Sequence, residues 1–232
     1  DWVLYTQNIV CKYYADSILV HGDKRILPLI SDRTRQANSV QIIKDIEPIV
    51  KYTGYVCDEN QPVHNQKDNN IYVSTGLNKD EAVTVFKKIA EIAHYYPDYN
   101  FIMPIANKYN SMGGRRNKNI YLVEYVPELR KKLTTCAAYI TYGGYNATVE
   151  ILKGQIPSIV VPRQSGKKME QFIRAFTFEP YDFYKVLTLQ EFNNIKIVLD
   201  EILNGYKPKP FEFNLKGASN TARFLAGMYN EL

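Results

Sequence analysis

Thr141-Tyr-Gly-Gly-Tyr-Asn-Ala-Thr-Val-Glu150-Ile-Leu-Lys-Gly154 carries the strongest structural signal in this 232-residue chain. The apolar run 137–140 before it is typical of a buried strand, and Gly143-Gly144 suit a turn without side chains. Asn146 is a candidate cap for a helix that Gly154 ends. The stretch therefore predicts a strand, a tight turn and a helix in immediate succession.

The start of this predicted helix is suited to bind phosphate, because backbone N–H groups at a helix start attract anions. Glu150 falls about one turn into the helix, and its side chain leans back toward the glycines, where it could accept hydrogen bonds from sugar hydroxyls. Taken alone, Gly143-Gly144 is an ordinary turn and Glu150 an ordinary acidic residue near a helix start. Taken together, they indicate a site for a nucleoside diphosphate sugar.

The pattern continues downstream with Pro157, Pro162 and the pair Glu170-Gln171. From about residue 143 to 175 it resembles the nucleotide-sugar signature of the GT-B glycosyltransferases. The similarity is closest to glycosyltransferase family 28, which includes the bacterial peptidoglycan N-acetylglucosaminyltransferase. Weaker similarity extends over 16–232. Glu170 stands where the family has the first of two Gln residues, so the identity of the sugar stays open.

The resemblance implies a role for the matching residues. Glu150 would bind the ribose hydroxyls of the donor, and Glu170 and Gln171 would face its sugar. The segment 71–76 is similar to the family's first phosphate-facing strand and loop, and Val126 lies where the family's main chain contacts uracil. The donor-binding residues implied in this way are Ser74, Thr75, Gly76, Val126, Gly143, Gly144, Asn146, Ala147, Glu150, Gln164, Glu170 and Gln171.

Apolar strand-like runs alternate with amphipathic helical segments, such as Asp80–Tyr95, along the whole chain. This alternation predicts an α/β fold with a doubly wound, parallel, Rossmann-like sheet, and the resemblance assigns it to the C-terminal half of a GT-B fold. Ligands of such sheets bind at the carboxyl ends of the strands, where Ser74, Gly143 and Pro162 are expected. The predicted strands are Ser17–His21, Val50–Val56, Asn70–Ser74, Phe101–Pro104, Ile120–Val123, Ala137–Thr141, Ser158–Val161 and Val186–Leu187.

A complete two-domain GT-B enzyme needs considerably more than 232 residues. By resemblance, we expect 1–30 to be a remnant of the N-terminal domain, 31–48 an interdomain connector and 49–232 the C-terminal nucleotide-sugar-binding domain. The missing acceptor-binding domain would then belong to a longer polypeptide or to a separate partner subunit.

Composition adds modest bounds. The net charge of +5 is spread along the chain, and the basic cluster Arg115-Arg116-Asn-Lys118 suits a solvated loop or a contact with an anionic acceptor or membrane surface. Three distant cysteines without a CxxC motif fit a reduced, cytoplasmic compartment. No grouping has metal-ligand spacing, no nucleic-acid motif is present, and no apolar run could span a membrane. We therefore expect no metal, no nucleic acid and at most peripheral membrane contact.

The resemblance implies transfer of a sugar from a UDP-sugar to a hydroxyl acceptor, with no cofactor besides this donor substrate. Family members draw the general base from the N-terminal half, so no catalytic residue is assigned in this chain. Two alternatives stay open. One is a nucleotide-sugar hydrolase or 2-epimerase of the same fold, and the other is a non-catalytic donor-binding subunit of a split glycosyltransferase.

Overall fold

The computed structural model describes residues 15–26, 47–58, 60, 62–74, 79–104, 117–163 and 170–230. These residues belong to two compact units, one formed by the chain up to residue 59 together with 212–232, and one formed by 60–211. The predicted interdomain connector at 31–48 falls almost entirely outside the described residues.

The larger unit contains a six-stranded sheet in which every pairing is parallel. Its strands are β3 (Asn70–Ser74), β4 (Asn100–Pro104), β5 (Ile120–Val123), β6 (Ala138–Thr141), β7 (Ser158–Val160) and β8 (Lys185–Val186). They lie in the order β5-β4-β3-β6-β7-β8, so the order reverses between β3 and β6. This is the doubly wound arrangement predicted from the sequence.

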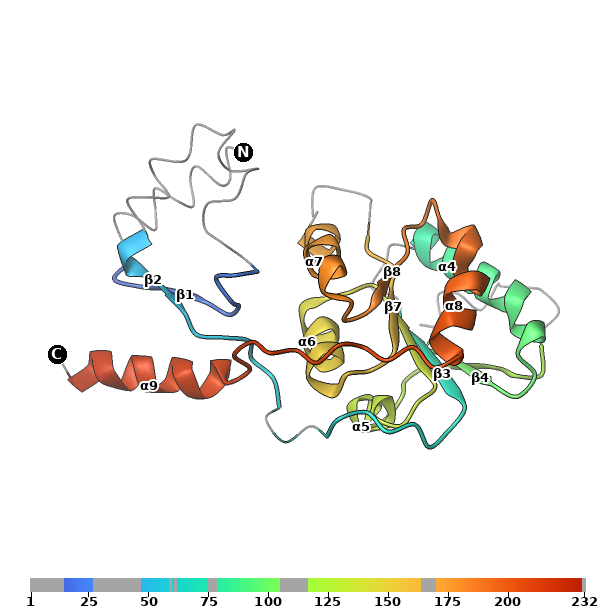
Figure 1. The fold of residues 1–232 in the computed structure, drawn as a ribbon, viewed down its shortest axis with the longest axis horizontal. Helices are drawn as coiled ribbons and strands as arrows, with labels where there is room; N and C mark the ends of the chain where they lie inside the picture. The colour runs from blue at the N-terminus through green and yellow to red at the C-terminus, as the bar shows by residue number, and fades with distance from the viewer. Residues whose placement is uncertain are drawn as a thin grey trace. The chain divides into compact units, whose positions relative to one another are not determined.

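Helices cover both faces of this sheet. They are α4 (Lys79–Ile92), α5 (Leu129–Leu133), α6 (Tyr145–Gly154), α7 (Glu170–Phe178) and α8 (Ile195–Leu203), with the 3-10 helices η2 (Ala93–Tyr95), η4 (Glu179–Tyr181) and η5 (Phe192–Asn194). Figure 1 shows α4 and α8 on one side of the sheet and α6 and α7 on the other. No helix in the described part of the chain is long and apolar enough to cross a membrane.

The main core lies between the central strands and the helices α4 and α8. Ile71, Ile140 and Ile159, one from each of three neighbouring strands, are almost fully buried. They share a hydrophobic cluster with Phe86 of α4 and Leu199 of α8. Every residue of β6 and β7 is buried, which explains why these strands are nearly continuous apolar runs in the sequence.

Helix α6 begins at another residue than predicted. Its N-cap is Gly144 in an extended conformation, and Asn146 lies in the first helical turn without capping it. The chain enters the helix early because Gly143 reverses its direction with a φ of 73°. Gly154 is the last helical residue, as predicted, and the left-handed C-cap that follows it is Gln155, with a φ of 51°. The prediction that Asn146 caps this helix is therefore wrong.

The smaller unit pairs β1 (Ile18–Val20) in parallel with β2 (Val50–Tyr52), which follows the 3-10 helix η1 (Glu47–Ile49). Beyond β2, Thr53 Oγ1 lies 2.9 Å from Nδ1 of His21. Helix α9 (Gly217–Asn230) is tied to the same segment, because Asn220 Nδ2 donates to the Thr53 carbonyl over 2.8 Å.

The single strand predicted over Val50–Val56 is wrong in its second half. Gly54 turns the chain with a φ of 91°, and the backbone N–H of Tyr55 donates to the carbonyl of Asn214 over 2.8 Å. Val56 then pairs in antiparallel fashion with Lys216. Gly54 and Tyr55 are buried against 214–217 rather than within the β1–β2 sheet, whereas Val56 is 37% exposed.

Loss of buried methyl groups from β7 should destabilise the larger unit far more than loss of exposed ones. Ile159 is fully buried, whereas Ile197 of α8 is 69% exposed. We expect Ile159→Ala to lower the free energy of unfolding by about 2–5 kcal/mol, because it leaves a cavity, and Ile197→Ala to change it by less than about 0.5 kcal/mol. Urea denaturation followed by circular dichroism measures both, and equal losses would contradict the placement of β7 in the core.

Candidate functional site

The carboxyl ends of β3 and β6 meet where the strand order reverses. Ser74 and Thr141, the last residues of these strands, stand opposite each other in the pairing. Ser74 Oγ donates to Thr141 Oγ1 over 3.3 Å and lies 2.8 Å from the hydroxyl of Tyr139. An open parallel sheet binds its ligands in the crevice at this point. Ser74 therefore lies at the edge where the site is expected.

Tyr139 and Thr141 were not identified as site residues from the sequence. They lie on one face of β6, because side chains two residues apart on a strand share a face. Tyr139 is buried, and this burial raises the pKa of its phenol, so the hydroxyl stays protonated beside Ser74. The sequence signal that could have identified them is their spacing, because Tyr139 and Thr141 are two hydroxyl side chains two residues apart just before the glycine pair.

The turn after β6 requires glycine at position 143 and is crowded at position 144. Gly143 has a φ of 73°, and a Cβ there would lie 2.7 Å from Cγ1 of Val160 on β7. A Cβ on Gly144 would lie 2.8 Å from the ring of Tyr142. Real Cβ atoms do not approach neighbours this closely, so the absence of side chains sets the path of the chain from β6 into α6.

The same turn is held by side chains from two helices. Arg174 of α7 donates from Nη1 to the carbonyl of Gly143 over 3.1 Å, and Thr148 Oγ1 of α6 donates to the same oxygen over 3.3 Å. The Arg174 guanidinium also lies 5.7 Å from the ring centroid of Tyr145, within range of a cation–π interaction. The turn is therefore fixed from both sides and carries a positive charge close to it.

The start of α6 points its backbone donors at this edge of the sheet. The first N–H groups of a helix have no acceptor within the helix, and Gly144 has no side chain that could supply one. Asn146 and Ala147 lie in this first turn, which the helix dipole makes favourable for an anion. The predicted residues Gly143, Gly144, Asn146 and Ala147 are thus brought together in one turn.

Glu150 lies in the second turn of α6 with its side chain 17% exposed. Its Oε1 accepts a hydrogen bond from Nε of Arg130 over 3.0 Å. Arg130 belongs to α5, which follows the loop that contains the buried Val126. Sequence reasoning missed Arg130, because a lone arginine in a charged helical segment carries no motif.

Two polar atoms, one shortly after β7 and one in the first turn of α7, are buried and have no hydrogen-bond partner among the described residues. They are Nε of Arg163, which follows β7, and Oε1 of Gln171, in the first turn of α7. Buried polar atoms rarely lack a partner, so both are candidates for bonds to a ligand. Gln171 is a predicted site residue, whereas Arg163 was not identified.

The remaining predicted site residues cannot be placed in this geometry. Thr75, Gly76 and Gln164 lie outside the described residues, as does the side chain of Glu170 at the first position of α7. The basic pair Arg115-Arg116 also lies outside them. The roles expected for these residues stay predictions.

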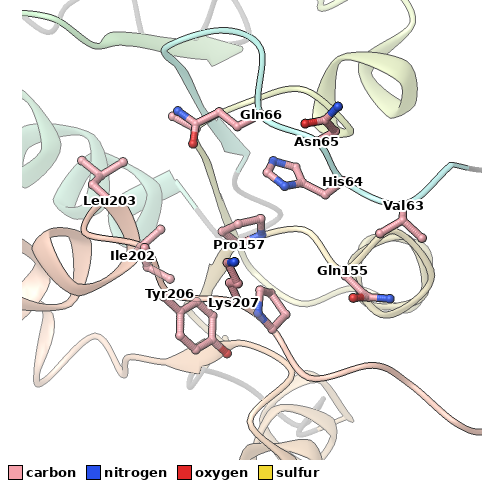
Figure 2. A pocket seen from close by; sticks show the side chains of 13 residues that line it. Val63, His64, Asn65, Gln66, Gln155, Pro157, Ile202, Leu203, Tyr206 and Lys207 are labelled. Atoms are coloured by element: carbon pink, nitrogen blue, oxygen red, sulfur yellow. The ribbon is translucent and has the colours of Figure 1, made fainter.

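A cavity of about 440 Å³ lies at the opposite edge of the sheet. Two of its lining residues, Ala137 and Pro157, immediately precede β6 and β7, so it opens at the amino ends of these strands. Figure 2 shows His64 on one side of it and Tyr206 and Lys207, from the segment after α8, on the other. This cavity is separate from the edge where the predicted residues gather.

The histidines make hydrogen bonds within the protein. Nε2 of His64 lies 2.7 Å from the Cys136 carbonyl, and Nδ1 of His94 lies 2.7 Å from the Glu91 carbonyl. In the described ranges, no three His, Cys, Asp or Glu side chains come close enough together to hold a metal ion.

No family model matches this chain, and no curated protein matches it significantly in sequence. Solved structures do match. The glycotransferase of kitacinnamycin superposes with a TM-score of 0.57 at 15% identity, over 82% of this chain and 47% of that one. CalG4, the calicheamicin glycosyltransferase, gives 0.56 at 16% identity, over 88% and 51%. The spinosyn rhamnosyltransferase SpnG complexed with thymidine diphosphate gives 0.55 at 14% identity, over 94% and 70%.

These similarities establish the fold. The matched proteins are GT-B glycosyltransferases, and the match over most of this chain confirms the predicted α/β, Rossmann-like arrangement. This chain spans about half the length of the first two structures. At such low identity the shared fold does not by itself assign an activity, and the closer resemblance to family 28 stays an expectation.

Alanine at position 143 should destabilise the protein more than alanine at position 205. Both glycines have a positive φ, which costs alanine about 1–2 kcal/mol. Only at Gly143 would the new methyl meet a neighbour, Val160, whereas nothing lies within 4 Å at Gly205. We expect Gly143→Ala to lower the free energy of unfolding by about 2–5 kcal/mol, since overpacking adds to the backbone strain, and Gly205→Ala by about 1–2 kcal/mol.

Gly227 in α9 provides the third variant, because its surroundings are open and its φ is not left-handed. Gly227→Ala should raise the stability of its helix by up to about 1 kcal/mol. Urea denaturation of the three variants measures these differences. Equal losses at positions 143 and 205 would contradict the close contact between the glycine turn and β7.

Proposed function

We propose that this chain is the donor-binding half of a GT-B glycosyltransferase, which transfers a sugar from a UDP-sugar to a hydroxyl acceptor. The proposal rests on one observation. At the carboxyl ends of β3 and β6, a glycine turn leads into a helix without a side-chain cap, and the carboxylate of Glu150 lies one turn further along this helix. Backbone N–H donors suited to a diphosphate and a carboxylate suited to accept ribose hydroxyls thus lie on one helix.

The diphosphate of the donor would lie at the start of α6. Backbone N–H groups around Gly144, Asn146 and Ala147 would donate to its oxygens, with the loop after Ser74, including Thr75 and Gly76, on the other side. Arg174, already bound to the Gly143 carbonyl, adds a positive charge to this region. Charge and backbone donors together favour a dianionic group there.

The nucleoside and sugar would extend from the diphosphate in different directions. Glu150 would accept hydrogen bonds from the ribose, and the main chain at Val126 would contact the base. Gln164, Glu170 and Gln171 would face the sugar. The buried, unpartnered Oε1 of Gln171 supports this part, because a sugar hydroxyl would satisfy it.

The chemistry of this half is the stabilisation of a leaving group. As the glycosidic bond breaks, negative charge develops on the diphosphate, and preorganised backbone donors lower the energy of that state. The general base would come from an N-terminal domain or a partner subunit. We therefore propose that this chain binds the donor but transfers little or no sugar alone.

The same proposal includes the domain limits 1–30, 31–48 and 49–232 and a reduced, cytoplasmic compartment. Cys136 is a buried free thiol, which supports such a compartment. Burial raises the pKa of Cys136 to about 12, so this thiol stays protonated and unreactive at neutral pH.

The nucleotide is the least constrained part of the proposal. At Val126 the main chain of the loop, and not a side chain, would determine which base is bound. SpnG was solved with thymidine diphosphate. A thymidine nucleotide is therefore the competing donor class. A donor titration has to include both nucleotides.

Calorimetric titration with UDP, UDP-N-acetylglucosamine, UDP-glucose and thymidine diphosphate tests the proposal. We expect saturable binding of one nucleotide class at the start of α6. Glu150→Gln should weaken it about 10–100-fold, because hydrogen bonds to a charged acceptor contribute about 1.5–3 kcal/mol each.

Glu91→Gln is the matched control. It removes the same charge and also an ion pair, with Lys88 at 3.1 Å, from the far end of α4. This variant should bind the nucleotide as the unmodified chain does. Binding that Glu150→Gln leaves unchanged would contradict the proposed site, and release of free sugar from the donor alone would favour a hydrolase.

A further inference from the structure

The ion pair between Arg130 and Glu150 joins two elements of the candidate site. Arg130 lies on α5, close in sequence to the loop of Val126, and Glu150 lies on the helix that follows the glycine turn. The contact runs from Nε to Oε1 over 3.0 Å, with side chains 50% and 17% exposed. A half-exposed arginine thus reaches a mostly covered carboxylate.

Such a pair contributes little to stability as an isolated interaction, because its arginine is solvated and screened. Its structural consequence is the direction of the carboxylate. A glutamate has several rotamers, and a charged N–H donor fixed on a neighbouring helix favours one of them. The guanidinium group is well suited to this role, since its N–H groups point in fixed directions.

Resting on the proposed function, we propose that Arg130 is a positioning residue that holds Glu150 for recognition of the donor's ribose hydroxyls. The Nε contact is made to Oε1 and holds the carboxylate in the orientation in which it would accept the ribose hydroxyls. Preference for a ribonucleotide over a nucleotide without these hydroxyls then depends on Arg130, although Arg130 does not touch the nucleotide.

The pair also connects the two protein segments proposed to contact the base and the diphosphate of the donor. The loop before α5 is the proposed base contact, and the start of α6 is the proposed diphosphate contact. Arg130 and Glu150 link these two segments by a direct hydrogen bond between side chains. A change at Arg130 should therefore alter ribose recognition without altering the diphosphate contact at the glycine turn.

The test is calorimetric titration of the chain and its variants with UDP and with 2′,3′-dideoxy-UDP. The unmodified chain should prefer UDP about 10–100-fold, as expected for loss of hydrogen bonds to a carboxylate. Arg130→Gln should weaken UDP binding about 5–20-fold and leave dideoxy-UDP binding within about twofold. In the Glu150→Gln background the same change should have no further effect, because the two residues act as a unit.

Lys132→Gln is the matched control for charge. It removes one positive charge from an exposed position of the same helix, and it should leave the preference for UDP unchanged. Arg130→Lys retains the charge without the fixed N–H geometry and should recover only part of the preference. A merely structural role of Arg130 would weaken both nucleotides equally.

The outcomes separate this inference from the proposed function. Failure of the unmodified chain to bind UDP would overturn the proposed function and this inference with it. Binding of UDP with a preference for ribose that Arg130→Gln leaves intact would overturn the role of Arg130 alone. An equal loss for both nucleotides in Arg130→Gln would also overturn it.

Discussion

Ser74 and Thr141 are 67 residues apart in the chain and stand opposite each other in the parallel pairing of β3 with β6. This pairing places the first strand of the sheet beside the fourth, so the strands of the two halves extend outward in opposite directions from it. The crevice at the carboxyl ends of these two strands is the place where a doubly wound sheet can receive a ligand. The glycine turn and the start of α6 lie at this crevice because α6 directly follows β6.

The glycine turn converts this arrangement into a defined geometry. Since Gly143 lies against Val160, α6 starts at a fixed position relative to β7 as well as β6. The Arg174 hydrogen bond then ties the middle of α7 to the same turn. The donors of α6, the carboxylate of Glu150 and the buried oxygen of Gln171 are consequently positioned by one tightly packed segment.

Secondary-structure elements with a local sequence signal could be predicted from the sequence. Asn70–Ser74 and Ile120–Val123 were predicted with the bounds that the structure has, because they are short apolar runs between turn residues. The cap of α6 was assigned to Asn146 from residue preference, whereas the positive φ of Gly143 starts the helix earlier. Such backbone detail depends on the contact with Val160, which no local pattern reveals.

The parts of the site that sequence reasoning missed depend on partners from distant elements. Tyr139 matters through Ser74, and Arg130 through Glu150; neither belongs to a motif of its own. His64 lies in a polar stretch of the sequence, yet it is half-buried and bonded to the Cys136 carbonyl, because the segment leading to β3 lies along the amino ends of the strands. Contacts of this kind follow from the order of the strands, which the sequence did not define.

Hydrogen exchange of the chain with and without UDP, followed peptide by peptide, tests the position of the site most directly. We expect slower exchange of the amides in 142–150 on addition of UDP, with no change at 63–66 and 202–208, which line the cavity at the opposite edge of the sheet. Protection of that cavity without protection of 142–150 would contradict the placement of the nucleotide at the start of α6.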